Sequence, residues 1–432
     1  MAGERAADWI SAAEARDAIL AGVARLDAER RPLLDALGYV LAEEVVSTVD
    51  LPPWDNSGMD GFAVRAEDVR GATPEAPRVL RVVDDVPAGH FPSRAVARGE
   101  AIRVMTGAPV PDGVDGVIRV EHTDGGTDIG TADARVAIRR DEDAGRNVRP
   151  RGEDVRRGQS VLAPGTVIRA GSVAVASSVG RSALSVIRRP RVAVLTSGDE
   201  LVLLDGFAEV EAGRRIVSSN TYALAAQLAE AEMEPRVLGI ARDTPASLRE
   251  HVERARGCDA LITSAGISVG EHDHVLRVMR EMETEIAFWR VRIRPGSAMA
   301  FGHVGGLGGI PWFGLPGNPV STLVCFELFV RPALLRMAGH TRVFPPAARV
   351  VVRDEHRGKP GLAQFPRVLL HRLQDGTLAA RLTGSQSSGV ASSMAAADAL
   401  LVVPGDRGSI AAGEVATAVV IGGAPLEAEP GW

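Results

Sequence analysis

The stretch Ala260-Leu261-Ile262-Thr263-Ser264-Ala265-Gly266-Ile267-Ser268-Val269-Gly270 decides the fold of this chain. Its first four residues have the composition of a buried strand, and a glycine-rich loop follows them directly. The same order of apolar strand, glycine turn and helix recurs at Trp312–Ser321 and at Val192–Leu201. This order predicts free backbone N–H groups at the carboxyl edge of a sheet, where anions and above all phosphates bind. A lone Gly-Asn-Pro turn can be a plain bend, but three glycine turns in one unit favour a binding edge.

Around these turns, residues 187–340 alternate strands with helices, which predicts a doubly wound and mostly parallel sheet. The expected strands are Val192–Leu195, Val237–Ile240, Ala260–Thr263, Ile286–Ile293 and Ala298–Phe301. Helices are expected to begin near Ser219, at Thr244-Pro245 and at Asp273, and a last helix is expected over Thr322–Ala338. Ligands of such sheets bind at the carboxyl ends of the strands, where all three glycine turns fall.

The segments on either side of this domain have a different pattern. Residues 8–27 predict an amphipathic helix, because Ser11 and Glu14 match a capping box before an apolar stripe. Residues 51–149 and 345–425 contain short strands divided by Gly and Pro, which predicts two β-rich domains. Residues 150–186 are predicted to form short strands and turns.

Composition limits the class of protein. The chain has 432 residues, of which 45% are hydrophobic and 24% charged, and its net charge is −6. These values are typical of a soluble globular protein and argue against a nucleic-acid partner. No run approaches the about 18 apolar residues of a membrane span, and no signal peptide is visible. Cys258 and Cys325 lie in or beside predicted core elements, so we expect buried, reduced thiols in a cytoplasmic protein.

Carboxylates follow several of the predicted strands and suggest a metal site. Glu200, Asp243, Glu271 and Asp273 are expected to converge at one edge of the sheet, where Mg²⁺ beside bound phosphates takes one or two carboxylates. The predicted metal ligands are Asp243, Glu271 and Asp273. A turn or helix N-cap is the rival interpretation, above all for Asp243, which stands just before Thr244-Pro245. A histidine-ligated metal in Glu271-His272-Asp273-His274 is disfavoured, because the chain has no matching His or Cys cluster elsewhere.

Positive charge gathers near residue 292. Arg290 and Arg294 are predicted to lie on one strand at i and i+4 and to share a face with Arg292. A solvated strand face is the rival interpretation. Arg294-Pro295-Gly296-Ser297 then predicts a turn at the sheet edge.

Six motifs together resemble those of the MoeA-type molybdopterin molybdenumtransferases, or molybdenum insertases, a family that includes the gephyrin E domain and the plant insertase domain. They stand in the family's order over nearly the whole chain, at Asp55–Gly61, Met105–Pro111, Arg151–Asp154, Thr196–Leu201, Ser264–Asp273 and Gly314–Ser321.

The resemblance implies three sets of site residues. Catalytic positions are matched by Asp60, Thr106, Asp154, Glu200, Asp243 and Asp273. The phosphates of the pterin nucleotide are expected on Ser197, Gly198, Gly266, Ser268, Gly270, Gly317, Asn318 and Pro319. The oxyanion molybdate is expected on Arg290, Arg294, Ser297, Arg367 and Ser388.

The resemblance also implies the reaction. Molybdate reaches the dithiolene of adenylated molybdopterin, the pyrophosphate bond is cleaved with the help of Mg²⁺, and AMP and molybdenum cofactor leave. It implies that residues 1–50 and 150–186 form one discontinuous N-terminal domain. It also implies an elongated homodimer whose sites use both subunits, and it names the upstream adenylyltransferase and the downstream molybdoenzymes as candidate partners. Sequence does not distinguish molybdate from tungstate.

Two other functions are weighed against this one. A molybdopterin adenylyltransferase would share only the α/β domain, whereas three of the six motifs lie outside it. A catalytically inactive, gephyrin-like scaffold would not require the acidic positions, which are all present. The chain departs from the common Lys-Pro-Gly-Lys-Pro pattern at Arg294–Ala298, so Ser297 removes one positive charge, for which Arg292 could compensate.

Overall fold

The structure is a computed structural model that describes residues 9–265 and 274–421. The chain divides into two compact units. One contains residues 9–30, 38–42 and everything described from Ser185 onward, and the other contains residues 31–37 and 43–184. None of the helices in the described part of the chain has the length and apolar character that crossing a bilayer requires.

The first unit is built on a six-stranded sheet. Its strands, in spatial order, are β16 (Glu234–Ala241), β13 (Arg191–Ser197), β17 (Ala260–Ser264), β21 (Ile310–Leu315), β20 (Ala300–Val304) and β18 (Thr284–Trp289). The first four are mutually parallel, and β20 runs antiparallel to both of its neighbours. The predicted mostly parallel sheet is therefore confirmed, with one antiparallel strand.

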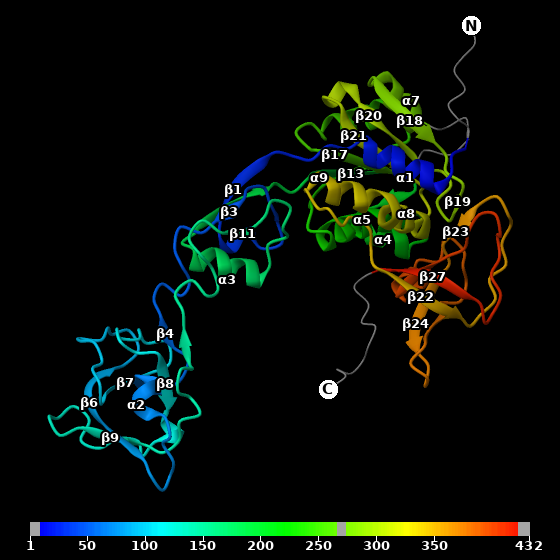
Figure 1. Cartoon of the computed structure of the whole chain (residues 1–432). Helices are drawn as coiled ribbons and strands as arrows, with labels where there is room; N and C mark the ends of the chain where they lie inside the picture. The colour runs from blue at the N-terminus through cyan, green and yellow to red at the C-terminus, as the bar shows by residue number, and fades with distance from the viewer. Residues whose placement is uncertain (1–8, 266–273, 422–432) are drawn as a thin grey trace. The chain divides into compact units, whose positions relative to one another are not determined.

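Helices cover both faces of this sheet, which explains why its central strands are apolar without a break (Figure 1). On β13, Val192 and Val194 belong to one hydrophobic core, and Ala193 and Leu195, which point to the other face, belong to a second. The helices of the first core are α1 (Ala12–Ala21), α5 (Ser219–Glu230), α8 (Pro319–Cys325) and α9 (Arg331–Met337). Those of the second are α6 (Pro245–Glu253) and α7 (His274–Glu281).

Two helix starts follow the sequence signals. Ser11 caps α1, because its Oγ accepts a hydrogen bond from the Glu14 N–H at 3.2 Å and Glu14 Oε2 accepts one from the Ser11 N–H at 2.7 Å. Thr244 caps α6, with Pro245 at the first helical position. Asp243 is therefore not the N-cap, so that half of the rival interpretation is wrong, while the interpretation as a turn residue stays a prediction.

Two of the expected helices have different bounds. The helix expected over residues 8–27 is confined to α1, ten residues long. The helix expected from Thr322 starts at Pro319, where the fixed φ of proline suits the first turn, and a π-helical stretch over Phe326–Val330 separates α8 from α9.

The single strand expected over Ile286–Ile293 is wrong. Strand β18 ends at Trp289 because Arg290 has a φ of +92°, which turns the chain out of the extended conformation. A separate short strand, β19 (Ile293–Arg294), pairs instead with β23 (Ala363–Gln364). The arginines at 290, 292 and 294 therefore do not lie on one strand, and the argument that they share a face fails.

The C-terminal β-rich prediction corresponds to a closed barrel. Its strands, in order around the barrel, are β22 (Ala347–Val352), β25 (Leu378–Leu382), β24 (Arg367–Arg372), β26 (Ala399–Val402) and β27 (Val415–Val420). Alternate residues such as Val350, Val352 and Leu401 fill its interior. Closure pairs every strand edge, so this small domain exposes little unpaired backbone.

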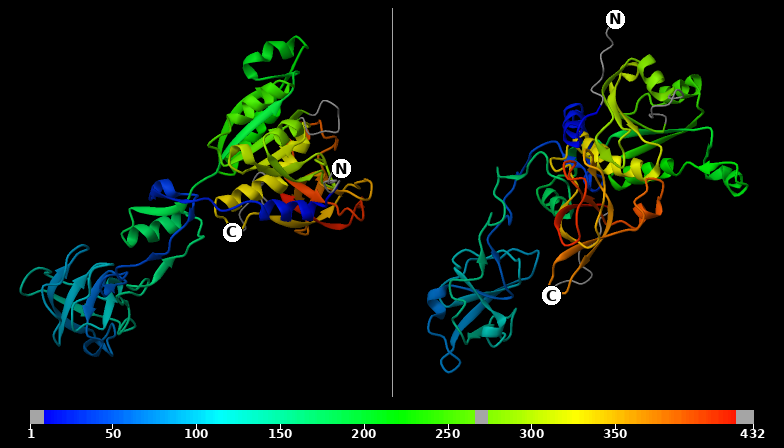
Figure 2. Two further views of the ribbon diagram at one scale, coloured as in Figure 1. Left: turned by 90° about the horizontal axis from the view of Figure 1, so that it is seen from above. Right: turned by 90° about the vertical axis from the view of Figure 1, so that its right-hand side faces the viewer.

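The second unit holds a five-stranded sheet over the region predicted to be β-rich. Its order is β8 (Gly116–Arg119), β5 (Gly61–Val64), β7 (Glu100–Val104), β6 (Arg78–Val86) and β9 (Arg135–Ile138). Figure 2 shows these strands, in blue to cyan, gathered in one compact group.

The longer of the two unexpected α-helices in this unit is α3. Residues 150–186 were predicted as strands and turns, but α3 spans Ala170–Ser178. Its sequence, Ala-Gly-Ser-Val-Ala-Val-Ala-Ser-Ser, has no amphipathic stripe and contains Gly171, so neither periodicity nor helix propensity signals it.

The remaining elements are short. In the first part of the chain they are β1 (Ala28–Pro32), β2 (Val40–Leu41), β3 (Val45–Val46), β4 (Asn56–Ser57), α2 (Ala66–Val69), β10 (Val148–Arg149), β11 (Ser160–Leu162) and β12 (Ala183–Ile187). Later elements are β14 (Leu201–Val202), α4 (Phe207–Glu211), β15 (Ile216–Val217) and α10 (Ser392–Ala395). Cys258 and Cys325 are both buried free thiols, as predicted, and burial raises the pKa of Cys325.

Candidate functional site

The turns after β17 and β21 are tied together by one buried amide. Asn220, at the start of α5, donates from Nδ2 to Ser264 Oγ at 2.9 Å and to the Gly317 carbonyl at 2.8 Å. Thr322 Oγ1 donates to the Pro316 carbonyl at 2.5 Å. These bonds fix the two turns to each other, so the sheet edge is preorganised before any ligand arrives.

A cavity of about 500 Å³ lies at this edge. Four of the predicted site residues line it: Glu200, Gly317, Asn318 and Pro319. Its polar lining is completed by Thr196, Ser218, Ser219, Asn220 and Ser264. The prediction that the turns after β13 and β21 meet at one site therefore agrees with the geometry.

Two other predicted phosphate contacts lie elsewhere. Ser197 and Gly198 follow β13 directly, but neither lines this cavity: Ser197 is buried, and the Gly198 N–H is occupied by the Ala241 carbonyl at 3.2 Å. The predicted residues Gly266, Ser268, Gly270, Glu271 and Asp273 lie outside the described residues.

The carboxylates of Asp199 and Asp243 form a reciprocal pair at the ends of β13 and β16. Asp243 Oδ2 accepts from the Asp199 N–H at 3.3 Å, and Asp199 Oδ1 accepts from the Asp243 N–H at 3.4 Å. Each carboxylate keeps further lone pairs free for an oxygen-seeking cation such as Mg²⁺. Within residues 9–265 and 274–421, however, no three His, Cys, Asp or Glu side chains gather closely enough to hold a metal by themselves.

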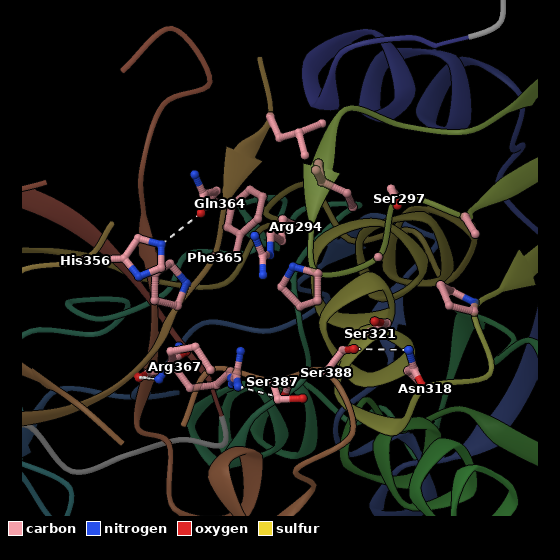
Figure 3. Close-up of a pocket in the computed structure, with 18 of the residues that line it drawn as sticks. Arg294, Ser297, Asn318, Ser321, His356, Gln364, Phe365, Arg367, Ser387 and Ser388 are labelled. Atoms are coloured by element: carbon pink, nitrogen blue, oxygen red, sulfur yellow. Dashed lines mark hydrogen bonds between the residues drawn. The ribbon is translucent and has the colours of Figure 1, made fainter. Parts of the chain in front are cut away.

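A second and larger cavity, of about 670 Å³, contains most of the predicted oxyanion residues (Figure 3). Arg294, Ser297, Arg367 and Ser388 all line it. Asn318 lines both cavities, as do Ala298 and Pro316, and Asn318 Nδ2 donates to Ser388 Oγ at 3.1 Å. The two cavities therefore adjoin at these residues.

Positive charge dominates this second cavity. Arg367 is only 1% exposed, and burial lowers its pKa. Among the described residues, its guanidinium donates only to neutral oxygens, those of Ser393 Oγ and of the Ser385 and Ser387 carbonyls, each at 3.2 Å. Neither Arg367 nor the exposed Arg294 forms an ion pair with any described carboxylate. A buried cation without a counterion favours the binding of an anion.

The fifth predicted oxyanion residue, Arg290, does not line this cavity. Its guanidinium instead stacks over the rings of Trp289, at 4.6 Å, and Trp9, at 5.7 Å. Arg292, expected to compensate for the neutral Ser297, is exposed and is also absent from the lining. The placement of these two arginines follows from the break of the strand at Arg290.

Three predicted catalytic residues belong to the second unit. Asp60 Oδ1 accepts hydrogen bonds from the Thr106 N–H at 2.7 Å and from Thr106 Oγ1 at 2.8 Å, and these bonds lower the pKa of Asp60. The fold thus brings Asp60 and Thr106, which are 46 residues apart in the sequence, into direct contact. The bonds from Thr106 favour the ionised form of the Asp60 carboxylate. Asp154 is exposed, and Arg151 pairs with Asp50 at 2.7 Å.

Several lining residues were not predicted from the sequence. Ser321, His356, Arg357, Gln364, Gln386 and Ser387 all line the larger cavity. Of these, Ser321 had a signal, because it ends the motif Gly314–Ser321. The others belong to the barrel and its loops, whose approach to β19 no local pattern reveals.

Comparison with known proteins agrees with this architecture. Residues 10–180 match the MoeA N-terminal region (domain I and II), residues 193–336 match a probable molybdopterin binding domain, and residues 349–421 match the MoeA C-terminal region (domain IV).

Individual relatives match over most of their length. Molybdopterin molybdenumtransferase 2 of Mycobacterium tuberculosis is 37% identical over 88% of this chain and 92% of its own, and the Nostoc molybdopterin molybdenumtransferase is 36% identical over 88% and 85%. The crystal structure of the molybdopterin biosynthesis moeA protein from Pyrococcus horikoshii matches with a TM-score of 0.79 and 28% identity, over 96% of this chain and 100% of the other. The predicted multidomain α/β fold and the predicted transferase class are confirmed, and the chain belongs to the family of molybdopterin molybdenumtransferases.

Proposed function

We propose that this protein inserts molybdenum from molybdate into adenylated molybdopterin and releases AMP. The observation that carries the proposal is the pair of adjoining cavities that share Asn318, one lined by polar turns and the other by arginines and serines. A pterin nucleotide in the first cavity and an oxyanion in the second would be neighbours. Proximity of two reactants is a large part of what such a site contributes to catalysis.

The oxyanion would lie against Arg367, Arg294, Ser388 and Ser297. Guanidinium and hydroxyl groups suit a tetrahedral dianion, because they donate several hydrogen bonds to its oxygens. Arg290 is left out of this proposal, since it lines neither cavity.

The nucleotide phosphates would lie on the turn Gly317-Asn318-Pro319, next to Glu200 and the hydroxyl groups of the smaller cavity. Glu200 would accept a proton from the water that attacks the pyrophosphate bond, after which AMP leaves. Asp243, with Asp199 beside it, has the oxygen donors that Mg²⁺ prefers, and we propose that Glu271 and Asp273 complete this metal site. The ion, when bound, would neutralise charge on the phosphates.

We also propose a homodimer in which Asp60, Thr106 and Asp154 complete the site of the other subunit. The support is chemical: an ionised Asp60 held by Thr106 resembles a catalytic or metal-binding group more than a structural ion pair. Light scattering at micromolar concentration tests this, and a mass near one 45.4 kDa chain would contradict it. The cytoplasmic location and partner proteins stay predictions.

The test of function is cofactor formation from purified protein, adenylated molybdopterin, Mg²⁺ and either molybdate or tungstate. Release of AMP together with cofactor is the expected result, and the two oxyanions reveal the metal preference. Pyrophosphate release from ATP and molybdopterin would support an adenylyltransferase instead, and no conversion in either assay would support a scaffold. The family match over residues 10–180 and 349–421, outside the central domain, favours the insertase.

A further inference from the structure

The larger cavity contains a histidine that the proposed reaction has not used. His356 lines it (Figure 3). It comes from the loop that follows β22, and the next residue, Arg357, also lines the cavity. The backbone of His356 is anchored to the barrel, because its N–H donates to the Ile410 carbonyl at 2.9 Å and its carbonyl accepts from the Ile410 N–H at 3.0 Å. These two bonds fix the backbone of His356, and with it the start of the side chain, on the barrel.

A buried glutamine fixes which nitrogen of this ring carries hydrogen. Gln364 is 2% exposed, and its Nε2 faces the Gly408 carbonyl at 2.6 Å and the Lys359 carbonyl at 3.4 Å. Carbonyls only accept hydrogen bonds, so the amide nitrogen must point toward them and the amide oxygen toward His356. Gln364 Oε1 then accepts from His356 Nε2 at 2.9 Å, which means that Nε2 carries a hydrogen.

The other ring nitrogen, Nδ1, is left available. It has no hydrogen-bond partner in the part of the chain that the structure describes, and it is not sealed from solvent. With Nε2–H held on Gln364, any further proton taken up by the ring goes to Nδ1 and converts it from an acceptor into a charged donor.

The charged groups around His356 come from several elements. Arg294 on β19 is the register partner of Gln364, and Arg367 lies on β24. On the loop of His356 itself, Arg357 pairs with Glu355 at 2.8 Å, and beside Ile410 the pair Arg407 and Glu414 is likewise neutralised. Among the described residues, the cavity thus presents two arginines without an acidic partner, Arg294 and Arg367, whose charges a bound dianion would neutralise.

We infer that His356 is an oxyanion-binding residue of the larger cavity, and that Gln364 positions it so that Nδ1–H donates to the bound dianion. This inference rests on the proposed function, because it assigns one more ligand to the same molybdate. Binding would then take up a proton, and the affinity for molybdate would fall as the pH rises. Gln364 is a positioning residue and does not touch the anion.

The test uses calorimetric titration of sodium molybdate into the full chain without pterin, at pH 6 and pH 8, in buffers of different ionisation enthalpy. For the wild type, the dissociation constant should be about tenfold larger at pH 8 than at pH 6, the size expected for one charged hydrogen bond. The dependence on buffer enthalpy should reveal net proton uptake. His356→Gln should bind weakly at both pH values and take up no proton.

Two further variants make the result decisive. His356→Lys, which keeps a charge at both pH values, should bind tightly at both. His371→Gln, on β24 but outside the cavity lining, is the matched control and should behave as the wild type. Unfolding midpoints of all variants identify any loss of folding, and if His356→Gln does not fold, His356→Lys alone decides.

The outcomes separate this inference from the proposed function. If the wild type binds molybdate and His356→Gln retains the same pH dependence and proton uptake, the role of His356 is wrong and the oxyanion site stands. If His356→Lys shows the pH dependence of the wild type, the role is equally wrong. If the folded wild type binds no molybdate at either pH, the oxyanion site and this inference both fall.

Discussion

Two buried charges, one in each unit, have opposite surroundings. Asp143 in the second unit accepts a bidentate pair of hydrogen bonds from Arg119, at 2.8 Å from Nε and 2.9 Å from Nη2. Arg367 in the first unit lines a cavity, and the described residues give its guanidinium only neutral oxygens as hydrogen-bond partners. A buried charge that is fully paired within the chain needs no ligand, whereas an unpaired one at a cavity is best satisfied by one. The contrast separates charges that hold the fold from charges that serve a ligand.

Replacing the carboxylates proposed for catalysis should have the largest effect on activity. Asp60→Ala and Asp243→Ala are each expected to lower the rate of cofactor formation about 100-fold or more, the usual cost of losing a group that moves protons or holds charge at a reacting centre. Asp60 is exposed, so the unfolding midpoint should hardly change. The exposed Asp205, replaced by Ala, is the matched control. Full activity in both variants would contradict the acidic site.

The Asp143–Arg119 pair should show the opposite behaviour, a change in stability without a change in oxyanion binding. Burial raises the pKa of Asp143, but its hydrogen bonds with Arg119 outweigh burial and bring the pKa to about 2, below the ordinary value of 3.8. Because the folded-state pKa is depressed, the stabilisation is complete above about pH 4 and is lost as the pH falls toward 2.

Arg119→Ala measures this contribution. The variant should lower the free energy of unfolding of the second unit by about 2 kcal/mol at pH 7, or somewhat less because Arg119 is partly exposed. The difference from the wild type should shrink as the pH falls from 5 to 2, as followed by urea unfolding. A difference that stays constant over this range would show that the ion pair is not its source.

Arg367→Lys probes the unpaired charge. Lysine keeps the charge but lacks the planar fork of donors, so we expect the dissociation constant of molybdate to rise about tenfold. Molybdate should also raise the unfolding temperature of the wild type more than that of the variant, since a ligand stabilises the state that binds it. Equal stabilisation by molybdate in both proteins would place the oxyanion elsewhere.

The turn that ends β19 should give the smallest effect. Arg294→Ala is expected to raise the molybdate concentration for half-maximal insertion, and Ser297→Lys to lower it. Each change corresponds to about 1 kcal/mol of binding free energy, because the cavity is open to solvent. Binding of adenylated molybdopterin should be nearly unchanged. If Arg294→Ala instead abolishes that binding and leaves the molybdate dependence alone, the turn belongs to the nucleotide.

The sequence alone determined the family, the doubly wound sheet and the smaller cavity, which is built from the turns after the strands. It could do so because these features are local: an apolar strand and the turn after it stand next to each other in the chain, and caps such as Thr244 act over three residues. The residues Glu200, Gly317 and Asn318 lay where that reasoning placed them, in one cavity.

Only the tertiary structure decided which residues line the larger cavity, where the arginines gather. The break lies at Arg290, whose φ is +92° and whose N–H donates to the Met299 carbonyl at 2.8 Å, and the apolar pattern of the sequence continues past this residue without a signal. His356 and Gln364 reach the oxyanion cavity because β19 pairs with β23, across 70 residues of chain. No local periodicity encodes such a pairing, because its free energy comes from packing the barrel against the α/β domain and not from the propensities of either segment.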